Sequence, residues 1–159
     1  MLTSRSQYCG LHIHGYTERR DAKATYSSPS VAGFMIAVGN VGESLLPYDD
    51  SDVFLTRDGG KSWEEVHKDA HLWEYGDSGS VIVLVNDEEA TDHVVYSTDE
   101  GLTWREYSFN DNLRVESILT VPTETSRKFV LLAKRPNDNE AKSIIVHLDF
   151  SRITQRKCQ

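Results

Sequence analysis

Cysteine is scarce in this sequence. The 159 residues contain two cysteines, Cys9 and Cys158, which lie near opposite ends of the chain. Because no Cys-x-x-Cys pair is present, the sequence disfavours a zinc ribbon and a dithiol redox motif. Two free thiols, one long-range disulfide, and pairing with cysteines outside this chain are all compatible with these positions.

Long apolar runs and an excess of positive charge are also lacking. No stretch of about 18 apolar residues is present, so we expect no transmembrane helix. The N-terminal residues lack the apolar region of a signal peptide. The chain carries 17 Lys and Arg against 25 Asp and Glu, a net charge of −8, and this acidity disfavours a surface for nucleic-acid phosphates. We therefore expect no membrane segment and no nucleic-acid partner.

An internal repeat is the strongest positive signal. Residues 56–63 (TRDGGKSW) align with residues 97–104 (STDEGLTW), 41 residues further on, and the similarity continues on both sides. Periods of roughly 40–45 residues are typical of four-stranded propeller blades. The repeated segments are rich in β-branched and aromatic residues and contain Asp-Gly or Glu-Gly turns, which indicates strands and hairpins rather than helices.

The repeat predicts an all-β fold, a partial β-propeller of about three four-stranded antiparallel blades. Each repeated motif is expected to close a hairpin and to bury its Trp ring, with strands at residues 53–57, 63–67, 93–98 and 103–108. Further strands are expected at residues 11–14, 33–38, 71–75, 80–85, 115–121, 128–133 and 144–148. Only residues 150–156 suggest a short helical turn.

The repeated pattern Ser/Thr-x-Asp-x-Gly-x-Ser/Thr-Trp is the Asp-box of β-propellers, and each position has a physical role. Its Asp can accept backbone N–H bonds across a tight turn, its Gly permits a positive φ, and its Trp offers a large apolar ring to the hairpin. We therefore predict that these residues shape turns rather than act as catalytic carboxylates or calcium ligands. They are Thr56, Asp58, Gly60, Ser62 and Trp63, and Ser97, Asp99, Gly101, Thr103 and Trp104.

Other candidate sites are weak. His12 and His14 should point to one face of a strand, but a metal site needs further ligands that the sequence does not identify. No Ser/His/Asp or Cys/His triad can be assembled from sequence spacing. We expect no catalytic residue, no cofactor and no metal.

The ordered motifs resemble the sortilin family, and most closely its fungal branch of vacuolar sorting receptors for carboxypeptidase Y. The resemblance extends from about Cys9 to Cys158. It rests on residues 9–14 (CGLHIH), 38–42 (VGNVG), 74–83 (EYGDSGSVIV), 96–104 (YSTDEGLTW), 148–150 (LDF) and 156–158 (RKC). The Asp-boxes alone also occur in sialidases, whereas the ordered set is more specific.

The resemblance implies the last blades of a ten-bladed luminal propeller, with residues 1–159 ending where a cysteine-rich module begins. It further implies that Cys9 and Cys158 are half-cystines whose partners lie upstream and downstream of this chain. Since the sequence shows no signal peptide, membrane span or cytoplasmic sorting tail, we expect it to be a fragment that cannot carry cargo by itself.

For function, the resemblance implies part of a non-enzymatic sorting receptor. Such a receptor binds luminal protein or propeptide cargo and delivers it from the Golgi to the vacuole or endosome, so the chain is expected on the luminal side of those membranes. One alternative is a sialidase-like Asp-box glycoside hydrolase, which needs clustered arginines and a Tyr/Glu pair. Another is a propeller interaction module of unknown partner.

Overall fold

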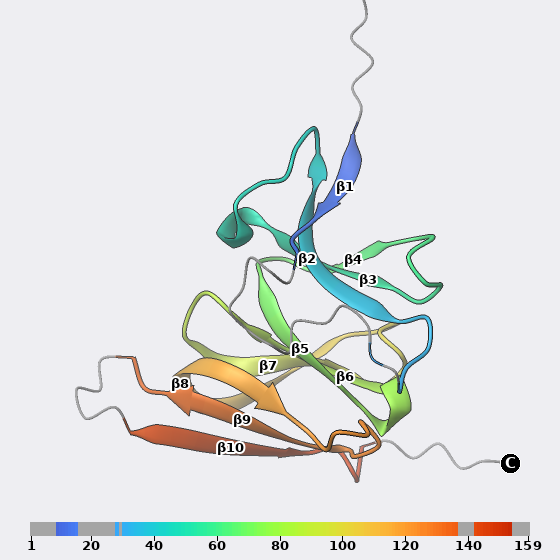
Figure 1. The fold of residues 1–159 in the computed structure, drawn as a ribbon. Helices are drawn as coiled ribbons and strands as arrows, with labels where there is room; N and C mark the ends of the chain where they lie inside the picture. The colour runs from blue at the N-terminus through green and yellow to red at the C-terminus, as the bar shows by residue number, and fades with distance from the viewer. Residues whose placement is uncertain (1–8, 16–27, 29, 137–141, 154–159) are drawn as a thin grey trace, which may run out of the picture.

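The computed structural model describes residues 9–15, 28, 30–136 and 142–153, and these form two antiparallel β-sheets (Figure 1). The predicted all-β class and partial propeller are confirmed. Helical structure in the described residues is limited to two 3-10 turns, Tyr48–Asp50 and Asp77–Gly79. The expected helical turn near the C-terminus is a simple turn at residues 151–153, and the rest of that segment lies outside the described residues.

The first sheet has four strands in the order β1-β2-β3-β4, the arrangement expected for one propeller blade. We call it the first unit. Its strands are joined by antiparallel pairing throughout. The strands are β1 (Gly10–Ile13), β2 (Met35–Gly42), β3 (Asp52–Thr56) and β4 (Glu64–His67).

The second sheet has six strands in the order β10-β9-β8-β7-β6-β5. In the sequence, three of these strands precede the longest strand of the sheet, and two follow it. The strands are β5 (His71–Gly76), β6 (Val81–Asn86), β7 (Thr91–Ser97), β8 (Arg105–Leu119), β9 (Lys128–Lys134) and β10 (Ser143–Asp149).

Strand β8 makes this sheet different from the three separate four-stranded blades that we predicted. Its first part pairs with β7 from Arg105 to Ser108 and again at Leu113, and its last part, from Arg114 to Leu119, pairs with β9. The chain therefore passes from one blade to the next without a break in the strand. We call β5–β7 with the first part of β8 the second unit, and the last part of β8 with β9 and β10 the third unit.

Two apolar cores lie between these units. The first core joins the first and second units and contains Ile36, Val53 and Leu55 from one side and residues of β5, β6 and β7 from the other. The second core joins the second and third units through residues of β6, β8, β9 and β10, including the fully buried Phe129. The stacking of unit on unit supplies the interior, as expected for a propeller arc.

Strand β6 shows why the sequence contains an uninterrupted apolar run. Ile82 and Leu84 belong to the first core, whereas Val81, Val83 and Val85 belong to the second. Because successive side chains of a strand point to opposite faces, a strand covered on both sides has no position for a polar residue.

No helix among the described residues is long and apolar enough to cross a membrane.

Candidate functional site: the two Asp-box turns

The first Asp-box turn joins β3 to β4, as predicted. The Thr56 hydroxyl donates to Asp58 Oδ1 at 2.8 Å and accepts the N–H of Gly60 at 3.0 Å. The carboxylate of Asp58 also accepts the backbone N–H of Ser62 at 2.9 Å and the Ser62 hydroxyl at 2.7 Å. All four contacts lie within seven residues, and Gly60 has a φ of 90°.

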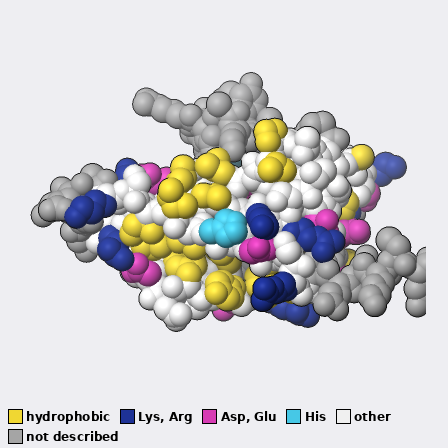
Figure 2. Space-filling model, turned by 90° about the horizontal axis from the view of Figure 1, so that it is seen from below, with side chains coloured by type: hydrophobic (Ala, Val, Ile, Leu, Met, Phe, Trp, Pro, Cys, Tyr) yellow, Lys and Arg dark blue, Asp and Glu magenta, His cyan; other side chains and the backbone are white. Residues whose placement is uncertain are grey.

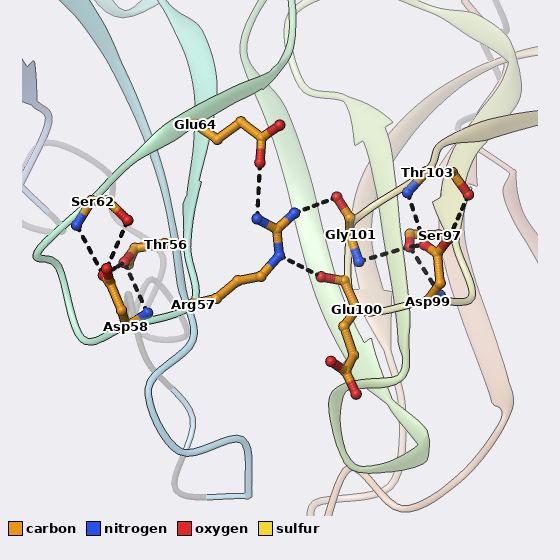
Figure 3. A network of polar contacts seen from close by, with 10 residues as sticks. All are labelled: Thr56, Arg57, Asp58, Ser62, Glu64, Ser97, Asp99, Glu100, Gly101 and Thr103. Carbon is orange, nitrogen blue, oxygen red and sulfur yellow. Dashed lines mark hydrogen bonds and ion pairs between the residues drawn. The ribbon is translucent and has the colours of Figure 1, made fainter.

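The second Asp-box turn joins β7 to β8 and repeats these contacts. The Ser97 hydroxyl donates to Asp99 Oδ1 at 2.8 Å and accepts the N–H of Gly101 at 2.8 Å. Asp99 accepts the backbone N–H of Thr103 at 2.9 Å and the Thr103 hydroxyl at 2.6 Å. The two turns are thus built alike at an offset of 41 residues, and Figure 3 shows them facing one another.

Arg57 connects the two turns, and sequence analysis did not identify it. Its Nε donates to the carbonyl of Glu100 at 2.9 Å and its Nη2 to the carbonyl of Gly101 at 2.5 Å. Its Nη1 forms an ion pair with Glu64 at 2.8 Å (Figure 3). The guanidinium of the first box therefore holds two carbonyls of the second box, and this contact joins the first unit to the second.

Further contacts connect these turns to the third unit. The N–H of Glu100 donates to the carbonyl of Ser80, and Asp77, in the turn between β5 and β6, donates its N–H to the carbonyl of Ser126. Asp77 also pairs with Arg127 at 3.0 Å. Because these hydrogen bonds pass from turn to turn, residues from all three units share one edge, on the right in Figure 1.

Hydrogen bonding keeps both Asp-box carboxylates charged. The backbone N–H of Ser62, followed by the hydroxyls of Ser62 and Thr56, lowers the pKa of Asp58 to about 2. Burial acts to raise the pKa of Asp99, but the hydrogen bonds from Thr103 and Ser97 outweigh it and lower that pKa. Both carboxylates accept hydrogen bonds from residues of their own turns.

Acid should therefore weaken the first turn. The pKa of Asp58 is about 2 in the folded chain and close to 3.8 in an unfolded one, so the stability that it contributes is present above about pH 4 and is lost as the pH falls through 2. Urea unfolding between pH 5 and pH 2 should show a smaller loss for Asp58→Asn than for the wild type. Equal losses in the two proteins would contradict this assignment.

Removal of the second carboxylate should also be measurable. We expect Asp99→Ala to lower the free energy of unfolding by about 1–2 kcal/mol, because the N–H and hydroxyl of Thr103 lose their acceptor. Thr98→Ala, at the neighbouring position of the same turn, serves as the control and should cost less. A larger loss for Thr98→Ala in urea unfolding would show that Asp99 does not hold the turn.

Loss of the Arg57 side chain should loosen the contact between units. Arg57→Met removes the donors to two carbonyls while keeping most of the apolar stem, and we expect a cost of about 1–2 kcal/mol. Glu64→Gln removes only the exposed ion pair and should cost less than about 0.5 kcal/mol. If chemical denaturation ranks the two variants the other way, the carbonyl contacts contribute little.

The Trp rings are less buried than we predicted. Trp63 and Trp104 are both half-buried, and each ring lies beside the glycine of its own turn. Trp104 packs against the core between the first and second units. We therefore expect Trp104→Ala to cost less than removal of a fully buried aromatic residue.

The remaining sequence candidates lie apart from this site. The His12 ring hydrogen-bonds to the carbonyl of Gly42, and the buried His14 ring to the hydroxyl of Ser51. Among the described residues, no group of three or more His, Cys, Asp or Glu is placed to hold a metal. Cys9 is an exposed free thiol, while Cys158 lies outside the described residues, so the expectation for its pairing stays a prediction.

Comparison with known families gives two adjacent matches. Residues 2–118 match the family described as "Sortilin, neurotensin receptor 3", and residues 120–159 match "Sortilin, neurotensin receptor 3, C-terminal". The boundary falls at the end of β8, so β9 and β10 lie in the second match although they extend the sheet of the first.

Individual relatives agree with these matches. A protein of Laccaria bicolor named "Vacuolar protein sorting/targeting protein 10" is 62% identical over 94% of this chain, and one of the same name from Mycosarcoma maydis is 59% identical over 94%. A Saccharomyces cerevisiae protein described as an uncharacterized membrane glycoprotein is 47% identical over 95% of the chain. The matched segment makes up 10%, 10% and 14% of these three relatives, so the chain spans only a small part of their length.

Proposed function

Because the chain belongs to the sortilin family, we propose that it is one segment of a sorting receptor that binds luminal protein cargo and carries it from the Golgi to the vacuole or endosome. The observation that carries this proposal is the match of residues 2–118 to the family, together with two relatives named for vacuolar protein sorting. These names point away from an enzyme. The membrane glycoprotein among the relatives supports a receptor located at a membrane, and we propose that this segment lies on the luminal side.

Within such a receptor, we infer that this segment serves as scaffold. The Asp58 and Asp99 carboxylates accept hydrogen bonds from their own turns, and Arg57 holds the carbonyls of Glu100 and Gly101. A sialidase-like site needs carboxylates and arginines directed at a substrate. The contacts of these groups favour turn and inter-unit stabilisation instead.

We further propose that the propeller runs through β10 and that the cysteine-rich module begins near Cys158. The unbroken pairing of β8, β9 and β10 supports this placement. The exposure of the Cys9 thiol is compatible with a disulfide to a cysteine outside this chain. The cysteines can be tested by non-reducing peptide mapping of a longer protein, in which a Cys9–Cys158 disulfide would contradict the proposed arrangement.

The receptor function can be tested by a segment exchange. In Mycosarcoma maydis, the matching segment of the sorting relative would be replaced by these 159 residues, and secretion of a vacuolar hydrolase such as carboxypeptidase Y would be measured. We expect the exchanged receptor to keep the hydrolase inside the cell, whereas a receptor without the segment should allow its secretion. If an exchanged receptor of normal abundance and Golgi location still permits secretion, the proposal fails.

A further inference from the structure

We propose that the loop between β2 and β3, which exposes the three consecutive apolar residues Leu45, Leu46 and Pro47, is a docking surface for a basic and apolar segment of a luminal cargo protein. This inference rests on the proposed function, because it assigns a chemical class to the cargo and a place on this segment where the cargo binds. The Asp-box turns serve as scaffold at one end of the strands, and the loop adds a binding role at the other end.

The register of the strands places the loop at the end opposite to the Asp-box turns. Met35, at the start of β2, pairs with Thr56 of the first Asp-box. The loop follows Gly42, at the other end of β2, and is seen at the upper left of Figure 1. The contacts that join the Asp-box turns to one another therefore do not involve this loop.

Buried polar side chains hold the loop in place. The Asn40 side chain, which is buried, donates to the carbonyl of Ser44 at 2.9 Å and accepts the N–H of Leu46 at 2.9 Å. The hydroxyl of Ser51, also buried, donates to the carbonyl of Pro47 at 2.9 Å. Because these contacts fix the backbone on both sides, the apolar side chains are held in the solvent in a conformation that binding does not have to order. Three neighbouring apolar residues exposed in this way indicate an interaction surface.

A contact between the first two units brings a second acidic segment to this loop. The hydroxyl of Tyr48, which directly follows the apolar residues, donates to Asp87 Oδ2 at 2.9 Å in the turn between β6 and β7. Two acidic residues follow Tyr48 in the loop and two follow Asp87 in the turn, and all four are exposed. These four border carboxylates are Asp49, Asp50, Glu88 and Glu89.

No Lys or Arg among the described residues pairs with the four border carboxylates. Residues 30–56 and 69–104 contain neither Lys nor Arg, and the ion pairs of the described residues include none of the four. Lys68, between β4 and β5 at the same end of the strands, pairs with Asp52 at 2.9 Å and with Glu65 at 2.6 Å. The negative charge beside the apolar loop is therefore left to attract a cationic partner.

The third unit shows that this charge imbalance is not general in the chain. Figure 2, which views the molecule from below, shows Lys and Arg side chains on the same face as acidic and apolar ones. In this unit Lys128 pairs with Asp149 at 3.5 Å, and Lys134 pairs with Glu116 at 2.6 Å. Unbalanced carboxylates beside exposed apolar side chains thus distinguish the loop between β2 and β3.

The partner that fits this surface is a chain segment whose apolar side chains are flanked by Lys or Arg. Its apolar side chains would cover Leu45 and Leu46, and its cations would meet the four border carboxylates, which gives the apolar centre and polar rim of a specific interface. Charge complementarity of this kind speeds encounter and rejects acidic partners. The same carboxylates repel the anionic headgroups of a membrane surface, so the charge favours a protein segment over a lipid.

Thiol labelling within a whole receptor tests this surface. We would place these 159 residues in the Mycosarcoma maydis relative, introduce Leu45→Cys or Leu102→Cys, and follow N-ethylmaleimide labelling by peptide-resolved mass spectrometry. Leu45 is 40% exposed, and Leu102, in the second Asp-box turn, is 66% exposed. The probe is a synthetic peptide of leucines flanked by lysines. At about ten times its dissociation constant, it should slow the labelling of Leu45→Cys about tenfold and leave that of Leu102→Cys unchanged, and equal effects at the two positions would overturn the proposal.

Two altered peptides and two charge variants test the chemistry of the partner. A peptide with glutamates in place of the lysines, or with serines in place of the leucines, should give no protection, and protection by either would contradict the proposed class. Combining Asp49→Lys with Glu88→Lys should raise the dissociation constant of the leucine-lysine peptide by about an order of magnitude. Glu106→Lys, at an exposed position of β8, serves as the control and should change it less than about twofold. Equal changes would mean that only the net charge matters and would refute the site.

Other occupants of the loop would give different labelling patterns. Protection of Leu45→Cys by neutral phosphatidylcholine vesicles would identify a lipid surface, and protection without peptide would identify another part of the receptor or, if lost on dilution, a second copy. Each of these results would overturn the proposal. Because labelling reports binding at the loop and not delivery, a failed docking surface leaves the cargo assay free to succeed, and a failed cargo assay leaves the labelling result valid.

Discussion

Phe129→Ala should lower the free energy of unfolding by about 3–5 kcal/mol, the range for truncation of a buried aromatic residue. Phe129 is 0% exposed and lies in the core between the second and third units. Its ring packs edge-on against Phe150 at a centroid distance of 5.7 Å, and its tip lies close to Gly76. Alanine would leave a cavity where the Phe129 ring now contacts Phe150 and Gly76.

The neighbouring residue provides the control for Phe129. Val130 lies on the opposite face of β9 and is only half-buried, so Val130→Ala should cost about 1 kcal/mol. Urea or thermal unfolding of both variants and of Phe129→Leu, which refills part of the cavity, gives the comparison. Similar losses for Phe129→Ala and Val130→Ala would mean that the third unit does not pack on the second in solution.

Gly101→Ala is expected to cost about 2–4 kcal/mol for two separate reasons. Gly101 has a φ of 77°, a conformation that costs a residue with a side chain roughly 1–3 kcal/mol. A Cβ at this position would also lie 2.4 Å from Leu55 Cδ2 and 3.4 Å from Ile82 Cδ1. Since Leu55 is 1% exposed, it can move only by disturbing the core between the first two units.

Gly59→Ala separates the two contributions. Gly59 has a φ of 74° in the first turn, but a Cβ there would meet nothing within 4 Å. Glu100 occupies the equivalent position of the second turn with a φ of 65°, so a side chain is tolerated there. Gly59→Ala should therefore cost only about 1 kcal/mol, the backbone contribution. An equal loss for both variants would remove the steric argument for Gly101.

The Asp-box hairpins could be predicted from sequence because their contacts are local. Every hydrogen bond that defines the first turn joins residues between Thr56 and Ser62. The positions of the hydroxyl, carboxylate and glycine in the eight-residue pattern are therefore enough to specify the turn. The spacing of two such turns then indicates the length of a blade.

The long strand β8 escaped prediction because of its pairing partners. The sequence predicts separate strands at residues 103–108 and 115–121, and the structure joins them from Arg105 to Leu119. Polar residues such as Asn110 and Asn112 lie between the two segments and indicate a turn. Pairing with β7 at one end and with β9 at the other joins both segments in one strand, although Asn110 has a positive φ of 60°.

The sequence by itself determined the all-β class and the hairpin turns, because these depend on patterns within some 40 residues, and it indicated the family through motifs ordered along the chain from residue 9 to residue 158. Only the tertiary structure decided that Arg57 caps Glu100 and Gly101, 43 and 44 residues away, and that the Trp rings stay half-buried. Contacts between units depend on how one unit stacks on the next, and no local pattern of residues specifies which side chains meet between two units.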